Sequence, residues 1–306
     1  TGNMPHVGRI GLAYFASPKG KILTEMTVTR LAKNDFLLMT GAGAYWHDRD
    51  LLMASLPAGG PITIIDVTRN LATLLVTGPK APAILADMTG QSMTHDDFAW
   101  LSHRKIDLAN CQANVIRVSF AGEAGFEIHC QMDDVVAVYD AVMAAGAAHQ
   151  LRPFGMLALD SMRLEKGYRS WKADLTSDYT MLESGLGRWV NFNKDDFVGR
   201  AALQAEKQAG SQVEFVTLTL DDPDDGAPFG EAVYLSNVSI DGVDAGLVVS
   251  AGYGHRVGAS IAMAVVNRQA LAKAKDISVL VLGRKRRATV VEGHALYDPE
   301  NAKMRV

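Results

Sequence analysis

Charged side chains of both signs are interleaved with aromatic ones between Ala158 and Arg200 (ALDSMRLEKGYRSWKADLTSDYTMLESGLGRWVNFNKDDFVGR). Burying an unpaired charge is expensive, so such residues either form ion pairs with one another or hold a polar ligand. The charged residues in question are Arg163, Glu165, Lys166, Asp174, Glu183 and Arg200. The glycines Gly167, Gly185, Gly187 and Gly199 predict turns rather than one long helix.

A second cluster lies upstream, in the segment Arg117–Glu127 (RVSFAGEAGFE), which predicts a strand, a tight glycine turn and a second strand. Glu127 follows the turn, and a carboxylate there can accept two adjacent N–H donors in a bidentate fork. The alternative is a structural role, in which Glu127 pairs with Arg117 across the two strands.

Taken together, the two clusters contain four motifs in order: R-x-S-[YF]-x-G-E-x-G-[FYW]-E, D-S-x-R-L-E-x-G, E-x-G-L-G and F-x-G-R. They resemble the folate-binding core of the glycine-cleavage T-protein (aminomethyltransferase) superfamily. The segments Val7–Arg30, Leu74–Pro79, Val248–Ala264 and Ala288–Val306 extend this resemblance over nearly the whole chain. The variants EKGYRSW, DLTSDYT and SAGYGH resemble the branch in which the folate domain follows a flavin domain, in dimethylglycine and sarcosine dehydrogenases and oxidases.

The resemblance implies a tetrahydrofolate site. A pterin ring presents an amino group and a ring N–H side by side, and the glutamate that accepts both in the resembled family corresponds to Glu127. The same resemblance places Arg163 at the folate site, with Phe120 where a tyrosine is also common. Glu123, in the turn, either contributes to the site or ties the loop to backbone N–H groups.

Glu25 is the predicted catalytic residue, by resemblance to a family aspartate near the folate nitrogens that carry the one-carbon unit. A carboxylate there would orient the reactants and stabilise developing positive charge. Here the segment departs from the pattern, since Lys21 replaces a glycine and Glu25 is one bond longer than aspartate. Lys172 also replaces a usual glycine. The alternative for Glu25 is an edge-strand glutamate that faces water.

Three further charged residues receive structural roles. Glu165 and Arg200 are expected to form an ion pair, and Asp174 belongs to the same structural set.

Composition narrows the class of protein. The chain has 306 residues, 48% of them hydrophobic, and a net charge of −4, which predicts an ordinary folded protein with no nucleic-acid surface. No apolar stretch reaches the ~20 residues of a membrane-spanning helix. Two cysteines predict no disulfide framework and favour the cytoplasm or, in a eukaryote, the mitochondrial matrix. The Arg284–Arg287 run is interpreted as a solvated turn before a strand.

Other cofactor sites are not supported. The segment Leu37–Gly43 (LLMTGAG) is similar to a dinucleotide fingerprint, but Trp46 stands at the third glycine, so no flavin site is expected within the chain. The histidines and cysteines form no metal-ligand pattern.

Alternating and helical patterns predict an α+β protein with packed helices on antiparallel sheets. The expected strands of the first domain are Ile10–Phe15, Ile22–Leu31, Phe36–Thr40, Ile62–Asp66, Leu74–Thr77, Val115–Phe120 and Phe126–His129. The expected helices are Ala44–Ser55, Pro79–Met88 and Met132–His149, and the segment 94–97 is expected to cap a helix that leads into 98–102.

The polar joint Gln204–Gln212 predicts a domain boundary near residue 206. Residues 1–205 would form the folate-binding domain and residues 206–306 a small β-barrel. The expected barrel strands are Val213–Leu220, Ala232–Leu235, Val238–Ile240, Leu247–Val249, Ser260–Val266, Ile277–Leu282 and Ala288–Val291, with a turn at residues 221–226. Because the chain opens on a strand-like pattern without an initiating Met, we expect part of the first domain, and an FAD domain, to precede Thr1.

The resemblance predicts a tetrahydrofolate-dependent one-carbon transferase, coupled to oxidative demethylation of a small methylamine such as dimethylglycine or sarcosine. Its partners would be folate, that substrate and a flavin oxidoreductase domain or subunit. Two alternatives stay open: a free-standing aminomethyltransferase or folate-dependent demethylase, and a non-catalytic folate-binding module.

Overall fold

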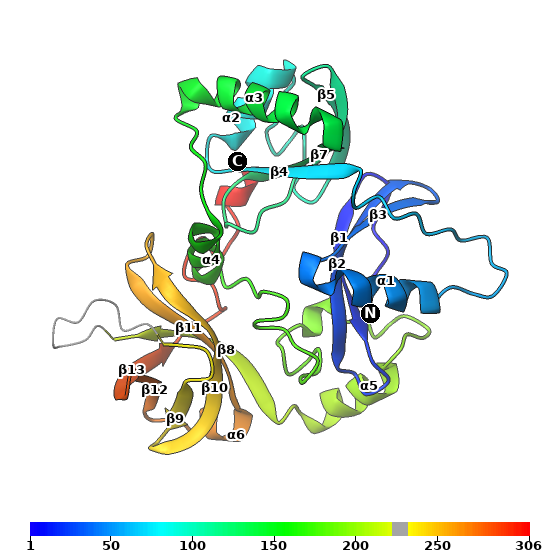
Figure 1. The fold of residues 1–306 in the computed structure, drawn as a ribbon. Coiled ribbons are helices and arrows are strands. Elements are labelled where there is room, and N and C mark those ends of the chain that lie inside the picture. Colours follow the sequence, from blue (N-terminus) through cyan, green and yellow to red (C-terminus); the bar gives the residue numbers. More distant parts are fainter. Residues whose placement is uncertain (222–231) are drawn as a thin grey trace. The chain divides into compact units, whose positions relative to one another are not determined.

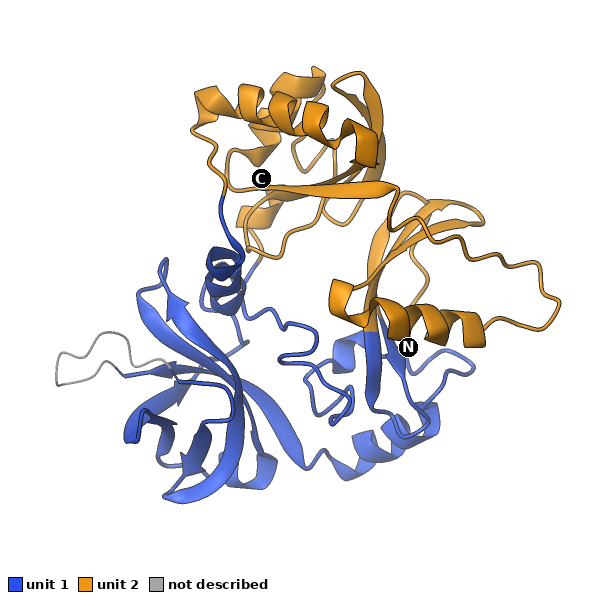
Figure 2. Ribbon diagram, viewed as in Figure 1, with its two compact units in different colours: residues 1–2, 14–24, 154–300 blue, residues 3–13, 25–153, 301–306 orange. Residues whose placement is uncertain are grey.

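A computed structural model of the chain describes residues 1–221 and 232–306 (Figure 1). The chain divides into two compact units (Figure 2). The first comprises Thr1–Gly2, Tyr14–Thr24 and Phe154–Glu300, and the second comprises Asn3–Ala13, Glu25–Pro153 and Asn301–Val306.

A three-stranded sheet of order β1-β2-β3 forms near the N-terminus. Its strands are β1 (Ile10–Ala16), β2 (Ile22–Ala32) and β3 (Asp35–Met39), followed by η1 (Ala42–Ala44) and α1 (Tyr45–Ala54). The side chains of Ile22, Thr24 and Met26 are buried, whereas the residues between them are half-buried. This period of two is the strand signature, and it confirms the predicted meander.

The second unit contains a four-stranded antiparallel sheet of order β4-β7-β6-β5. The strands are β4 (Leu71–Thr77), β5 (His103–Leu108), β6 (Cys111–Ile116) and β7 (Gly125–Gln131). One face packs on α2 (Ala81–Thr89) and α3 (Val135–Gly146). The short helices η2 (Met132–Asp134) and η3 (Ala147–His149) directly precede and follow α3. The apolar side chains of that face, among them Phe126 and Ile128, form the core with both helices.

The first unit contains a closed antiparallel barrel of order β10-β11-β8-β13-β12-β9. Its strands are β8 (Val213–Leu220), β9 (Asn237–Ile240), β10 (Val243–Gly254), β11 (Ala259–Asn267), β12 (Ile277–Val281) and β13 (Arg284–Val290). Val216, Leu218 and Leu220 belong to one apolar cluster of the barrel. Phe215, which alternates with them, packs with Leu164 of α4 (Met156–Glu165) in another. The remaining elements are η4 (Gly187–Trp189), α5 (Arg200–Ala209), α6 (Arg268–Leu271) and η5 (Lys303–Arg305).

Helices and antiparallel sheets thus confirm the predicted α+β class, but several local predictions are wrong. The segment 62–66 is no strand, and Ile62 and Ile65 are exposed, because no strand within residues 1–221 and 232–306 pairs with its β-branched residues. The segment 94–97 forms a single turn, closed by the bond from Phe98 N to Thr94 O (2.8 Å), with no helix after it.

Several predictions for the barrel also differ from the structure. Residues 232–235 form a turn rather than a strand, with Leu235 at a φ of 64°. The basic run Arg284–Arg287 is not a turn but the first half of β13, where it pairs with β12 and where Arg284, Lys285 and Arg287 are exposed. The predicted turn at 221–226 lies, from residue 222 on, outside the described residues. Outside the barrel, strand β5 of the four-stranded sheet was not predicted.

Among the described residues, no helix is both long enough and apolar enough to span a bilayer.

His294 provides a pH-dependent contribution to stability. Burial, followed by the positive charges of Arg169 and Arg188, lowers the pKa of its imidazole to about 4. Because this pKa lies below the unfolded value, the neutral ring stabilises the fold fully above about pH 6.5, and this stability is lost as the pH falls from about 6.5 to 4.

We therefore expect the free energy of unfolding to fall by about 1 to 2 kcal/mol between pH 7 and pH 4.5 through this group, allowing for solvent screening. Urea unfolding at several pH values measures the change. His294→Gln, which does not titrate, should show a shallower slope by that amount; equal slopes would contradict the assignment.

Candidate functional site

The loop between β6 and β7 carries two of the predicted folate-binding residues. Its inner side chains Ala121 and Ala124 are fully buried, whereas Phe120 is 38% exposed and Glu123 is half-buried. The end of the loop is held on β4, where the N–H of Gly78 and the hydroxyl of Thr77 both donate to the carbonyl of Ala124 (2.8 and 3.1 Å).

Gly125 is required where this loop enters β7. A Cβ at this position would stand 2.6 Å from the carbonyl oxygen of Val118, so any larger residue would push the two loop arms apart. The glycine of the G-F-E motif therefore sets the entry into β7, and through it the position of Glu127.

Arg117 does not pair with Glu127. Its guanidinium is fully buried and donates to the backbone carbonyls of Met93 (2.9 Å) and Phe98 (2.8 Å), and to the C-terminal segment at Val306. It also lies over the ring of Phe126, 5.4 Å from the centroid. Burial lowers the pKa of Arg117. The structural alternative for Glu127 is therefore wrong, since Arg117 serves as a tie between backbone segments.

Glu127 lies instead on the sheet face opposite the helices, with its side chain 29% exposed. Leu75 of β4 and Ile116 of β6 are its direct cross-strand neighbours. Its carboxylate oxygen Oε2 lies 3.3 Å from Nε2 of His129, two residues along the same strand. An accessible carboxylate between apolar neighbours can accept donors from a planar ligand.

His129 is a residue that the sequence analysis missed. It is 2% exposed, and its Nδ1 lies 3.0 Å from the hydroxyl of Thr73 on β4. The signal was present in the strand period of two, which places residues 127 and 129 on the same face.

Glu25 lies in β2, half-buried between Thr24 and Met26, whose side chains are fully or almost fully buried. Because β2 is the middle strand of its sheet, Glu25 does not lie on an edge strand as the structural alternative assumed. Lys21, the first departure from the family pattern, donates its Nζ to the carbonyl of Asp178 (2.8 Å).

Arg163 is buried at the end of α4, 2% exposed. Its guanidinium donates to Asp174 and Asp160 (Nε to Oδ1, 2.6 Å) and, across to β10, to the hydroxyl of Ser250 (2.9 Å). Asp174 is fully buried and also accepts the backbone N–H of Ser170 (2.8 Å). Arg163, predicted at the folate site, and Asp174, predicted to be structural, thus belong to one network. In it, Arg163 fastens α4 and the following loop to the barrel.

Glu165 is 1% exposed, and its partner is Arg256 of the barrel, whose backbone N–H (2.6 Å) and Nε both donate to the carboxylate. The predicted pairing with Arg200 is wrong, because Arg200 donates to the carbonyl of Phe192 (3.2 Å). Lys166 pairs with Asp298 (3.0 Å) in the same unit. These contacts satisfy charges that burial would otherwise destabilise.

Lys172 adopts a backbone conformation that is unfavourable for a residue with a side chain. Its backbone φ is 71°, in the left-handed region that favours glycine, which explains why glycine is usual there. The lysine ammonium lies over the ring of Trp171, 5.2 Å from its centroid.

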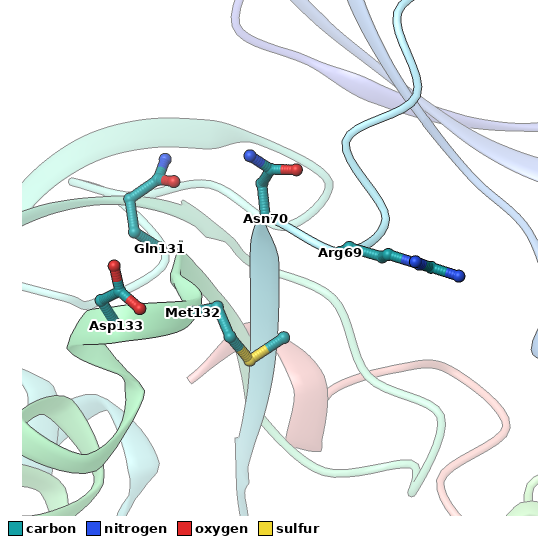
Figure 3. A pocket seen from close by; sticks show the side chains of 5 residues that line it. All are labelled: Arg69, Asn70, Gln131, Met132 and Asp133. Carbon is teal, nitrogen blue, oxygen red and sulfur yellow. The ribbon is translucent and has the colours of Figure 1, made fainter.

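A surface hollow of about 280 Å³ lies at the other end of the β4–β7 pair. Figure 3 shows its lining, which comes from the two residues before β4, the last residue of β7 and the start of η2: Arg69, Asn70, Gln131, Met132 and Asp133. None of the predicted site residues lines it. Within residues 1–221 and 232–306, no group of three or more His, Cys, Asp or Glu side chains gathers as metal ligands.

Comparison with known proteins decides the family. The GCVT N-terminal domain model matches residues 1–194, and the glycine cleavage T-protein C-terminal barrel domain model matches residues 214–298. The chain belongs to the glycine cleavage T-protein family. This is a family of tetrahydrofolate-dependent one-carbon transferases, so the predicted enzyme class is confirmed.

Individual relatives agree. The chain is 32% identical over 291 residues to human mitochondrial dimethylglycine dehydrogenase, covering 94% of this chain and 33% of that protein. It is 28% identical to an aminomethyltransferase of Anoxybacillus flavithermus, covering 93% of this chain and 76% of the relative. The chain thus spans about a third of the length of the dimethylglycine dehydrogenases it matches.

Among solved structures, the aminomethyltransferase T of the glycine cleavage system from Bartonella henselae has a TM-score of 0.80 at 22% identity. The match covers 95% of this chain and 77% of that structure, and it confirms the predicted aminomethyltransferase fold with its C-terminal barrel.

The Arg163 network supports a prediction on stability. Asp174→Asn should lower the free energy of unfolding by about 3 to 5 kcal/mol, because it leaves a buried guanidinium without its buried counter-charge. Denaturant unfolding measures the loss. Asp160→Asn is the matched control, since Asp160 binds the same arginine but is 50% exposed, and we expect it to cost less than about 1 kcal/mol. Equal losses in both variants would contradict the network as described.

Proposed function

We propose that this chain is a tetrahydrofolate-binding domain that transfers a one-carbon unit. Residues 1–205 would form the folate-binding domain and residues 206–306 its barrel domain. The observation that carries the proposal is Glu127, a partly exposed carboxylate on a sheet face, held at a strand entry that Gly125 determines.

The chemistry of Glu127 fits a pterin ring. Its two oxygens can accept the ring amino group and the adjacent N–H together, which orients the ring as well as binding it. We propose that Phe120 and Glu123, from the loop before β7, complete this part of the site. Arg163 would have a positioning role, since its guanidinium is buried among Asp160, Asp174 and Ser250 and fastens α4 and the following loop to the barrel.

Glu25 would assist the transfer. Tetrahydrofolate, when bound, would supply the two amine nitrogens that take up the one-carbon unit of an iminium or of formaldehyde as methylene-tetrahydrofolate, with release of the free amine or of water, respectively. The protein needs no covalent nucleophile for this step. Its contribution is to hold the reactants close, to exclude water and to stabilise developing positive charge with the Glu25 carboxylate.

The finer function we propose is capture of the carbon released when a small methylamine, such as dimethylglycine or sarcosine, is oxidised. The similarity to dimethylglycine and sarcosine dehydrogenases supports this assignment. It implies a flavin oxidoreductase domain or subunit as partner, in the cytoplasm or the mitochondrial matrix. A free-standing aminomethyltransferase is a second candidate, because the chain covers 76% of the length of a relative with that name.

Calorimetric titration with a stable reduced folate tests the site. We expect the chain to bind, and Glu127→Ala to weaken binding by at least about tenfold, because two hydrogen bonds to a charged acceptor are lost. Glu214→Ala, which removes a 48%-exposed carboxylate of the barrel, is the control and should bind as the unaltered chain does. Absence of binding, or equal binding by Glu127→Ala, would refute the proposed site.

Turnover tests Glu25. With formaldehyde as carbon source, the catalysed rate is the rate of methylene-tetrahydrofolate formation minus the uncatalysed rate. We expect Glu25→Gln to lower this catalysed rate about a hundredfold, while folate affinity stays unchanged. Undiminished turnover would remove Glu25 from the mechanism. Folate binding without turnover, on formaldehyde or any methylamine, would instead favour a non-catalytic module.

A further inference from the structure

His129 is the buried middle residue of a hydrogen-bonded series that runs from Thr73 to Glu127. The hydroxyl of Thr73 on β4 lies 3.0 Å from Nδ1 of His129, and Nε2 lies 3.3 Å from the Glu127 carboxylate on β7. Thr73 is directly opposite His129 in the strand register, so the cross-strand contact is built into the pairing of β4 with β7.

The two hydrogen-bonded residues His129 and Glu127 differ in their exposure to solvent. His129 is 2% exposed, whereas the Glu127 side chain is 29% exposed. A carboxylate that faces solvent while its hydrogen-bond partner is buried has one oxygen held from behind and lone pairs free for a ligand. A fixed acceptor loses less rotational freedom when a ligand binds than a freely rotating one does.

The bonds also select the form of the imidazole. A neutral histidine donates from only one ring nitrogen, and a carboxylate can only accept, so Nε2 must carry the proton. Nδ1 is then an acceptor, and the Thr73 hydroxyl, which can donate, satisfies it. Thr73 therefore keeps His129 in the tautomer that donates to Glu127.

We infer that His129 is a positioning residue that orients the Glu127 carboxylate for its planar ligand, and that Thr73 sets its tautomer. The inference rests on the proposed function, because it assigns the ligand of Glu127 as the pterin. It adds two residues that lie outside the motifs recognised in the sequence.

Folate titrations of three variants test the inference. We expect His129→Leu to weaken binding about tenfold, because the carboxylate loses its donor. His129→Gln can still present an N–H near the position of Nε2 and should restore most of the affinity. His149→Leu is the matched control: His149 contacts the carboxylate of Asp87 at 2.7 Å in the same unit, away from the site, and its loss should leave folate affinity unchanged.

Thr73→Val provides a test that does not depend on the buried position. Thr73 is an exposed strand residue, so valine should preserve folding, and it removes the donor that holds Nδ1 as acceptor. The proton can then move to Nδ1, and an unprotonated Nε2 would face the carboxylate. We expect folate binding to weaken several-fold although Thr73 makes no contact with Glu127.

A double-mutant cycle with Glu127→Gln separates positioning from general stability. His129→Leu should add little to the loss already caused by Glu127→Gln. Wild-type affinity in folded His129→Leu and in Thr73→Val, or equal losses with and without Glu127→Gln, would overturn the inference. If Glu127→Ala itself leaves binding unchanged, the proposed folate anchor fails, which is a different result from failure of His129 alone.

Discussion

The alternation of side chains along β7 is the constraint on which the candidate site depends. Successive residues of a strand point to opposite faces, so burying Phe126, Ile128 and Cys130 against α2 and α3 forces Glu127 and His129 onto the other face. A shift of one residue in the register with β4 would bury the carboxylate and expose the core. The apolar half of the strand thus determines where the chemical half must lie.

A second constraint operates in the other unit, where charges are buried next to a β-barrel. Arg163, Glu165 and Lys166 follow one another closely at the end of α4, and each has a counter-charge: Asp174, Arg256 and Asp298 respectively. Because an uncompensated buried charge destabilises a fold strongly, these pairs specify how α4 and its following loop attach to the barrel. The motif D-S-x-R-L-E-x-G, which resembles part of a binding site in the sequence, is thereby also a structural element.

Family membership and the site geometry support each other at different levels. The two domain models account for the fold and the one-carbon chemistry of the family. The geometry of this chain adds the details of its own residues: an accessible glutamate with a buried histidine behind it, and a lysine in a backbone conformation suited to glycine.

The sequence by itself determined the order of the motifs, hence the family, the class of fold and the choice of Glu127 as the central carboxylate. It also predicted most strands and helices, because their periodicity is local and depends on nearby residues. Strand 62–66 failed because a strand needs a neighbour, and no local pattern reveals whether one is present.

Only the tertiary structure decided which partners the charged residues take. Glu165 pairs with Arg256, 91 residues away, rather than with Arg200, and Arg117 binds backbone carbonyls rather than Glu127. Residue types show that a buried charge must be satisfied, but many groups can satisfy it. The choice among them follows from which elements pack together, and this depends on contacts distant in the chain.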